Sequence, residues 1–240
     1  MEIIDYKEIK NKIITRGYWE IVVRPVNFDE RLISDKKTLK DLIANNSVQL
    51  RGWSYPFCSR DLRDVQAVDK GVASGVDWGR HKEVWRFDES GQLINYVGLW
   101  EDWAEEDDWS GGEIRKHQAG SIFSIIGTVY TLTEIMEFVR RLSSSEYYKA
   151  GVHIEIALHN IKGRELVILD PMRGPLFDKY VCAEEDIVLE PRDYTVEEIQ
   201  SRSKEIAIDY VKRIFEMFNW NNMPLGVFQT DQEKLLEGRI

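Results

Sequence analysis

The chain has 240 residues, of which 43% are hydrophobic and 31% charged, with a formal net charge of −10 and a pI of about 5.1. This composition excludes disordered and fibrous proteins and supplies enough apolar residues for one large core or two small ones. Because the average electrostatic field repels phosphates and anionic membrane surfaces, unaided binding to nucleic acid is disfavoured. We expect a single domain over residues 1–240, or two packed subdomains, 1–110 and 111–240.

In the first part of the chain, helical and strand patterns alternate. Asp5 precedes apolar residues at helical spacing and predicts a short opening helix, and the aromatic and β-branched run 18–23 predicts a strand. Ser34 is expected to cap a second helix, and residues 48–53 predict another strand. The periodicity fades over residues 56–79, where we expect a long surface loop.

The clearest strand signal lies between residues 83 and 97. Two apolar runs, 83–87 and 92–97, flank the turn-forming residues 88–91 and predict a β-hairpin. The small residues Ser110-Gly111-Gly112 that follow further on are a candidate joint between the two subdomains.

The second part of the chain is expected to contain further strands and a long helix. Residues 122–130 predict a strand, and Thr131 is expected to open the helix that follows. Residues 152–158 and 165–169 predict a second hairpin, and a capping-box pattern over 195–198 predicts a long C-terminal helix. Paired strands with interspersed helices favour an α+β fold with a mixed, largely antiparallel sheet, hairpins and packed helices.

The cysteines and the first residues bear on the compartment. Cys58 and Cys182 stand 124 positions apart and form no C-x-x-C pair, so neither a disulfide framework nor a zinc knuckle is indicated. Residues 1–5 show no basic segment followed by an apolar run, and no stretch reaches the ~18 apolar residues of a membrane span. We expect a cytoplasmic protein without membrane contact, and the sequence indicates no cofactor.

Short catalytic motifs are missing from the sequence. It contains no P-loop, no G-x-G-x-x-G, no H-E-x-x-H and no G-x-S-x-G. The Glu-x-Lys pattern expected of a restriction-type nuclease occurs only at Glu8-Ile9-Lys10, on the predicted opening helix. These absences favour a protein that is not an enzyme.

Two His-x-Glu units are the strongest catalytic candidates, because a two-residue step on a strand places both side chains on one face. They consist of His81, Glu83, His153 and Glu155. If the two strands were neighbours, these groups could converge on a divalent metal or form an acid/base pair, with Asp77 and Asp170 as further ligands. The alternative is the ordinary polar face of a half-covered sheet.

Tryptophan and acidic residues cluster in the middle of the chain. Six of the eight tryptophans lie within the 57 residues from Trp53 to Trp109, and residues 101–108 carry six carboxylates. Such a surface suits a basic segment of a partner protein or a cationic ligand. The residues expected to contact the partner are Trp100, Glu101, Asp102, Trp103 and Trp109. The alternative is a solvated acidic loop anchored by one or two tryptophans.

A third candidate surface combines arginine with aromatic residues. Arg51, Trp53, Arg60 and Arg63 could together bind phosphates and unstacked bases. Neighbouring aspartates nearly cancel their charge, so ion pairs within the loop explain these arginines equally well. Direct nucleic-acid binding is therefore a further hypothesis.

Residues 51–56 and 83–93 resemble segments of uncharacterised prokaryotic proteins, some of which occur beside Schlafen-type AlbA modules. The resemblance covers less than a quarter of the chain, which shows no AlbA module of its own. It implies no activity and no catalytic residues. It implies an accessory protein that works with nucleic-acid-handling partners.

These features together favour a non-catalytic binding or accessory protein that engages a partner protein, in a prokaryotic nucleic-acid-handling or defence complex. Nucleic acid would then be contacted only indirectly, through the complex. A metal-dependent hydrolase or nuclease built on the His-x-Glu units and a direct nucleic-acid binder are the alternatives.

Overall fold

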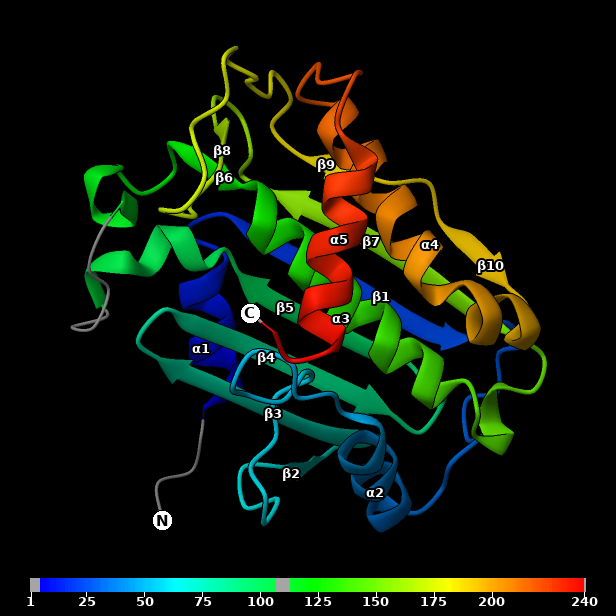
Figure 1. Ribbon diagram of the computed structural model, residues 1–240. Helices are drawn as coiled ribbons and strands as arrows, with labels where there is room; N and C mark the ends of the chain where they lie inside the picture. Colours follow the sequence, from blue (N-terminus) through cyan, green and yellow to red (C-terminus); the bar gives the residue numbers. More distant parts are fainter. Residues whose placement is uncertain (1–4, 107–112, 240) are drawn as a thin grey trace.

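The structure is a computed structural model that describes residues 5–106 and 113–239, and it is built around one large sheet (Figure 1). In the described chain this sheet has the strand order β10-β7-β1-β5-β4-β3-β2, with β9 also paired to β7. All its pairs are antiparallel. The strands are β1 (Tyr18–Pro25), β2 (Gln66–Val68), β3 (Gly71–Trp78), β4 (His81–Asp88), β5 (Leu93–Gly98), β7 (Val152–His159), β9 (Ile187–Val188) and β10 (Arg192–Tyr194). The predicted α+β class with a largely antiparallel sheet is confirmed.

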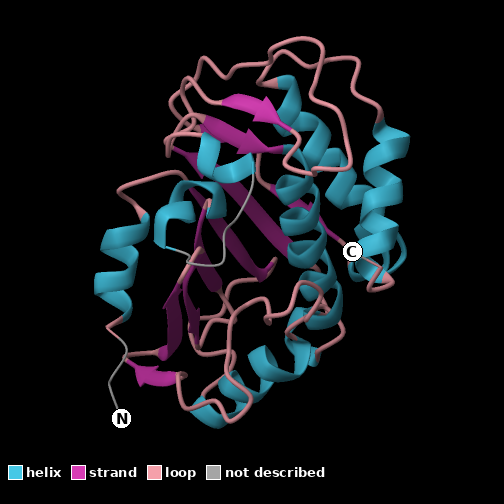
Figure 2. Cartoon of the chain, turned by 60° about the vertical axis from the view of Figure 1, so that its left-hand side comes forward, coloured by secondary structure: helices cyan, strands magenta, loops and turns pink. Residues whose placement is uncertain are grey.

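Helices cover both faces of this sheet, as the turned view shows (Figure 2). The α-helices are α1 (Tyr6–Ile13), α2 (Lys36–Asn46), α3 (Ile125–Leu142), α4 (Val196–Glu216) and α5 (Leu225–Leu236). Short 3-10 helices are η1 (Trp100–Glu106), η2 (Glu113–Lys116) and η3 (Glu146–Tyr148). None of the helices in the described ranges is long and apolar enough to cross a membrane.

The main core lies between the sheet and the layer formed by α3, α4 and α5 (Figure 1). Strand β1 shows the reason, because its side chains alternate and Trp19, Ile21, Val23 and Pro25 are the buried ones. Helix α1 covers part of the opposite face, where Ile9 and Ile13 pack against Val84.

The segment 122–142 differs from the prediction. Only Ile122–Ser124 forms a strand, β6, and α3 begins directly after it, so a helix opened by Thr131 is wrong. The Ser124 side chain caps α3 by accepting a hydrogen bond from the Gly127 N–H at 3.0 Å. The segment after Ser124 is buried on several sides of the helix, and residues 125–133 contain no charged side chain that would reveal a helical period.

The segment 48–79 also differs. Val48 makes only an isolated bridge to Tyr55, so the predicted strand over 48–53 is absent from the described structure. Part of the predicted loop over 56–79 is instead strand β3. The small residues of β3 are required by its neighbours: a Cβ on Gly71 would lie 2.6 Å from the Phe87 carbonyl oxygen.

The hairpin of β4 and β5 is confirmed, but the second predicted hairpin is wrong. Strand β8 (Glu165–Val167) leaves the main sheet and pairs in parallel with β6. The capping box at Thr195 is confirmed at the start of α4, which is followed by the shorter α5. The candidate joint over 110–112 lies outside the described residues, while β7, β9 and β10 from the second half lie in the same sheet as β1.

Candidate functional site

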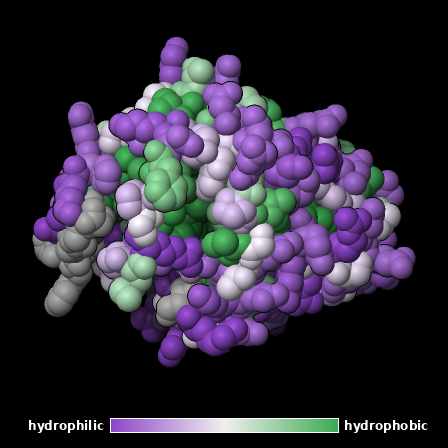
Figure 3. All heavy atoms as spheres, turned by 45° about the horizontal axis from the view of Figure 1, so that its top comes forward, coloured by the Kyte–Doolittle hydropathy of each residue, from purple (hydrophilic) through white to green (hydrophobic). Residues whose placement is uncertain are grey.

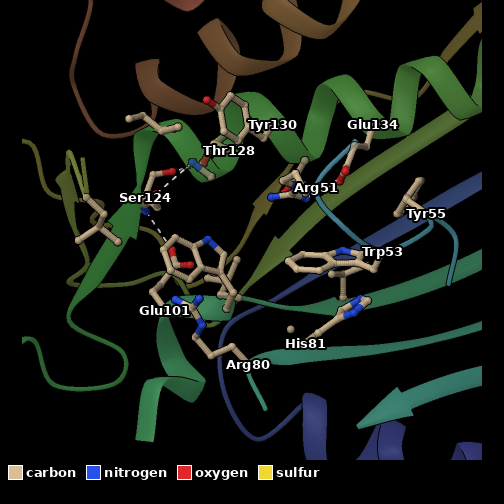
Figure 4. Close-up of a pocket in the computed structure, with 18 of the residues that line it drawn as sticks. Arg51, Trp53, Tyr55, Arg80, His81, Glu101, Ser124, Thr128, Tyr130 and Glu134 are labelled. Carbon is tan, nitrogen blue, oxygen red and sulfur yellow. Dashed lines mark hydrogen bonds and ion pairs between the residues drawn. The ribbon is translucent and has the colours of Figure 1, made fainter. Parts of the chain in front are cut away.

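A cavity of about 740 Å³ lies on the side of the sheet that α3 covers. It is enclosed by β4 and β5, the first half of α3 and the segment around Trp53. This volume is in the range of small-molecule sites. Aromatic residues form much of its wall: Trp19, Trp53, Tyr55, Trp78, Trp100, Phe123 and Tyr130. Figure 4 shows the polar side chains among them. On the face drawn in Figure 3, apolar side chains gather in hollows ringed by hydrophilic ones.

One polar wall is the His81–Glu83 pair on β4. His81 Nε2 lies 3.0 Å from Glu83 Oε2, while Glu83 Oε1 accepts hydrogen bonds from Asn95 Nδ2 at 2.7 Å and the Phe57 N–H at 2.9 Å. His81 therefore points Nε2 at the Glu83 carboxylate, and its Nδ1 is buried without a hydrogen-bond partner in the described structure. Trp53 packs against the imidazole, with the ring centroids 4.8 Å apart and the ring planes tilted by 31°.

A second polar wall joins the segment around Trp53 to α3. Arg51 donates from Nε to Glu134 Oε2 at 3.0 Å and also from Nη2 to the same oxygen. Its Nη2 further contacts Thr131 Oγ1 at 3.2 Å. Glu134 is almost fully buried, with 1% of its side chain exposed. The guanidinium therefore compensates a carboxylate that would otherwise be an isolated buried charge.

The floor of the cavity carries a third carboxyl group, Glu101 in η1. Glu101 Oε1 accepts a hydrogen bond from the Ser124 N–H at 2.9 Å, at the start of α3 (Figure 4). Burial raises the pKa of Glu101 to about 7, and the neighbouring charge of Asp102 adds to the shift. Next to it, the Arg80 guanidinium lies over the Trp100 ring, 4.8 Å from its centroid.

The last polar wall connects the segment after β8 to α5. Arg173 Nη1 donates to Asp231 Oδ2 at 2.7 Å, and Arg173 Nε lies 3.1 Å from Asp170 Oδ2. The end of α5 also brings Lys234 to the cavity. Residues far apart in the sequence thus meet around one space.

The two predicted His-x-Glu units do not converge. Strands β4 and β7 are separated by β1 and β5, and the cross-strand register places Glu83, Trp19 and Leu158 on one face of the sheet. Glu155 stands three residues from Leu158 and therefore on the opposite face. There His153 contacts Glu155 at 3.0 Å and Asp193 at 2.5 Å.

The other metal candidates are also apart from each other. Asp77 pairs with Lys12 and Lys82 on the face that α1 covers, whereas Asp170 lies at the cavity with Arg173. Within residues 5–106 and 113–239, no group of three or more His, Cys, Asp or Glu could hold a metal ion. The hypothesis of one metal site built from both His-x-Glu units is therefore wrong.

The predicted acidic and aromatic partner surface is mostly buried. Glu101, Asp102 and Trp103 are 4%, 1% and 2% exposed, so they are not available to a partner protein. Trp100 is half-buried and lines the cavity, and Trp109 lies outside the described residues. The acidic side chains turn inwards because backbone N–H groups and an arginine bind them there.

The predicted basic and aromatic surface is divided by the structure. Arg51 and Trp53 line the cavity, whereas Arg60 and Arg63 are exposed and do not line it. Arg63 forms an ion pair with Asp61 at 2.6 Å. This agrees with the alternative that these arginines form ion pairs within their own loop.

Sequence reasoning missed Glu134, Tyr55 and Tyr130. One signal could have found Glu134. It is a carboxylate on the buried face of α3, where most of the other residues belong to the apolar core. A buried carboxylate needs a compensating partner, so such a residue indicates a specific contact.

In comparisons with known proteins, no family model, no curated protein and no solved structure matches the chain.

Proposed function

We propose that this protein binds a small planar aromatic ligand in the cavity and is not a catalyst. One observation carries the proposal: the aromatic walls are interrupted by three buried polar atoms without a hydrogen-bond partner in the described structure, Tyr55 OH, His81 Nδ1 and Glu134 Oε1. Leaving such an atom unpaired costs about 1–3 kcal/mol. A ligand in the cavity would supply partners that the chain itself leaves missing.

The charges of the cavity support binding of a ligand with little net charge. Its lining includes five basic residues, Arg51, Arg80, Arg173, Lys234 and Arg239, and five acidic ones, Glu83, Glu101, Glu134, Asp170 and Asp231. The absence of short catalytic motifs from the sequence favours a binding role.

The proposal is tested by ligand-observed NMR with indole and quinoline as planar probes and cyclohexanol and piperidine as saturated ones. We expect saturation transfer to the planar probes only. Trp53→Ala should abolish it, because this change removes an aromatic wall, while Trp53→Phe should restore most of it. Equal transfer to planar and saturated probes, or none to either, would refute a site for aromatic ligands.

A second candidate function, engagement of a partner protein, is supported by the segment beside the cavity. Met172 and Phe177 are 90% and 107% exposed, two large apolar side chains within six residues. Under this proposal the partner belongs to a prokaryotic nucleic-acid-handling or defence complex. This part of the proposal comes from the sequence resemblance alone.

Photo-crosslinking in the native cells tests this second proposal. A photoreactive residue at Phe177 should give one discrete crosslinked product. The same residue at Phe28, which is 73% exposed and does not line the cavity, should not. Identical products from both positions would show that crosslinking needs only an exposed apolar position, and this would contradict a specific partner site at Phe177.

A further inference from the structure

The Arg51–Glu134 pair presents an unused acceptor and an unused donor at the cavity. Both hydrogen bonds from Arg51 go to Oε2 of Glu134, so Oε1 is left without a partner although it is buried. On the arginine side, Nε and Nη2 are engaged, and Nη1 donates to no described residue. A carboxylate oxygen accepts and a guanidinium N–H donates, so the pair offers both functions side by side.

An aromatic surface lies next to this pair. His81 covers one face of the Trp53 ring, at 4.8 Å between centroids, and the opposite face turns towards Arg51 and Glu134 (Figure 4). The Arg51 guanidinium carbon lies 5.7 Å from the centroid of the Trp53 ring. A planar ring stacked on Trp53 would therefore place its edge within reach of the acceptor and the donor.

We propose that the ligand is a heteroaromatic ring of the nucleobase kind, with an N–H donor and an acceptor adjacent on one edge. Glu134 Oε1 accepts from the N–H on this edge, Arg51 Nη1 donates to the acceptor beside it, and Trp53 stacks on the ring. This inference rests on the proposed function and narrows it to one class of ligand. The net charge of −10 favours a free base or nucleoside over a nucleic-acid strand as its source.

The test uses the unmodified full chain and titration calorimetry with matched nucleosides. The pairs are inosine and 1-methylinosine, uridine and 3-methyluridine, adenosine and N6,N6-dimethyladenosine, and cytidine and N4,N4-dimethylcytidine. In each pair, methylation removes the N–H donor of one edge and keeps the stacking surface. We expect at least one parent nucleoside to bind and its methylated partner to bind about tenfold more weakly or worse, because a buried carboxylate oxygen loses its donor.

Two control arms separate this inference from the proposed function. If indole and quinoline bind but no nucleoside does, or if methylation has no effect, the nucleobase inference is overturned while the aromatic cavity stands. If none of these probes binds, both fail. A single-stranded tetranucleotide of the preferred base should bind no more tightly than the nucleoside, and tighter binding would overturn the free nucleoside as the source.

A variant locates the contact. Glu134→Gln should reduce the discrimination between parent and methylated nucleoside to less than about threefold, with unfolding checked in parallel. Unchanged discrimination in a folded variant would place the contact elsewhere. Since the nucleoside pairs are compared on the unmodified chain, the inference stays testable even if this variant does not fold.

Discussion

Asp102 shows at the scale of one residue how an acidic run becomes part of the core. Its carboxylate accepts from Arg164 Nη1 at 2.7 Å and Nη2 at 2.6 Å, and from the N–H groups of Gly17 and Gly120, each at 2.9 Å. Both partners of the ion pair are almost completely buried. A charge run is usually solvated, so the sequence alone favoured exposure. The partner Arg164 is 62 positions away, and no local pattern indicates it.

Asp102→Asn tests this role. We expect a loss of about 3–5 kcal/mol in the free energy of unfolding, because Arg164 is left with an uncompensated buried charge. Urea denaturation measures the change. The matched control is Arg63→Ala, which breaks the exposed pair with Asp61 and should cost less than about 1 kcal/mol. Equal losses in the two variants would contradict a structural role for Asp102.

The pKa of Glu101 gives a prediction on pH. Burial raises this pKa to about 7, above its value in the unfolded chain, so between pH 5 and pH 7 the folded state holds a proton that the unfolded state has released. Glu101 therefore makes the folded protein less stable as the pH rises through this range, by about 3 kcal/mol in total. Glu101→Gln should match the unmodified protein at pH 5 and be more stable by a similar amount at pH 8. Denaturant titration at both values measures the difference, and a difference that does not vary with pH would contradict the prediction.

At the scale of elements, the sequence predicted those helices and turns whose formation depends on neighbouring residues. Asp5 and Thr195 cap the helices that the sequence placed after them, and the turn between β4 and β5 was predicted from its own residues. The predictions are wrong where contacts between distant residues determine the secondary structure. Gly71 in β3 has no room for a side chain beside the Phe87 carbonyl, and the first turns of α3 carry no charged residue that would show a helical period.

The residues of the candidate site also meet only through tertiary contacts. Arg51, Trp53, His81 and Glu83 were selected from their residue types, but in two separate groups with two separate roles. Their meeting depends on the packing of α3 against the sheet. The partner of Arg51 lies on α3, 83 positions along the chain.

Gly127 at the start of α3 tests the packing of this helix against η1. A Cβ there would lie 2.6 Å from Trp100 Nε1 and 3.0 Å from Ser124 Oγ. Gly127→Ala should therefore destabilise the protein by about 1–3 kcal/mol, although alanine is ordinarily the better helix residue. The control is Gly226→Ala in α5, where nothing lies within 4 Å, and a gain of up to about 1 kcal/mol is expected. Thermal or urea unfolding measures both, and a stabilising Gly127→Ala would show that Trp100 does not pack as described.

At the scale of the whole molecule, one sheet joins both halves of the chain. Strand β7 pairs with β1 along eight residues of each strand, and Phe123 lies against Trp19, with ring centroids 6.1 Å apart. A fragment of residues 1–110 would lack β7 and the helices that cover Trp19, Ile21 and Val23. The sheet order, which the sequence did not reveal, is what makes the two halves interdependent.

We expect the fragment 1–110 to show no cooperative unfolding by circular dichroism or tryptophan fluorescence. The full chain should unfold in one transition that both probes report at the same denaturant concentration. Two separate transitions in the full chain, or a folded fragment, would instead support two subdomains.

We propose that the aromatic cavity holds a planar ligand in the cell. The most direct measurement is mass spectrometry of the small molecules released by denaturing the protein after gentle purification from its native cells, with the Trp53→Ala variant prepared in parallel. We expect an aromatic heterocycle that is enriched with the unmodified protein and lost with Trp53→Ala. An absence of any such compound, or equal amounts in both preparations, would contradict it.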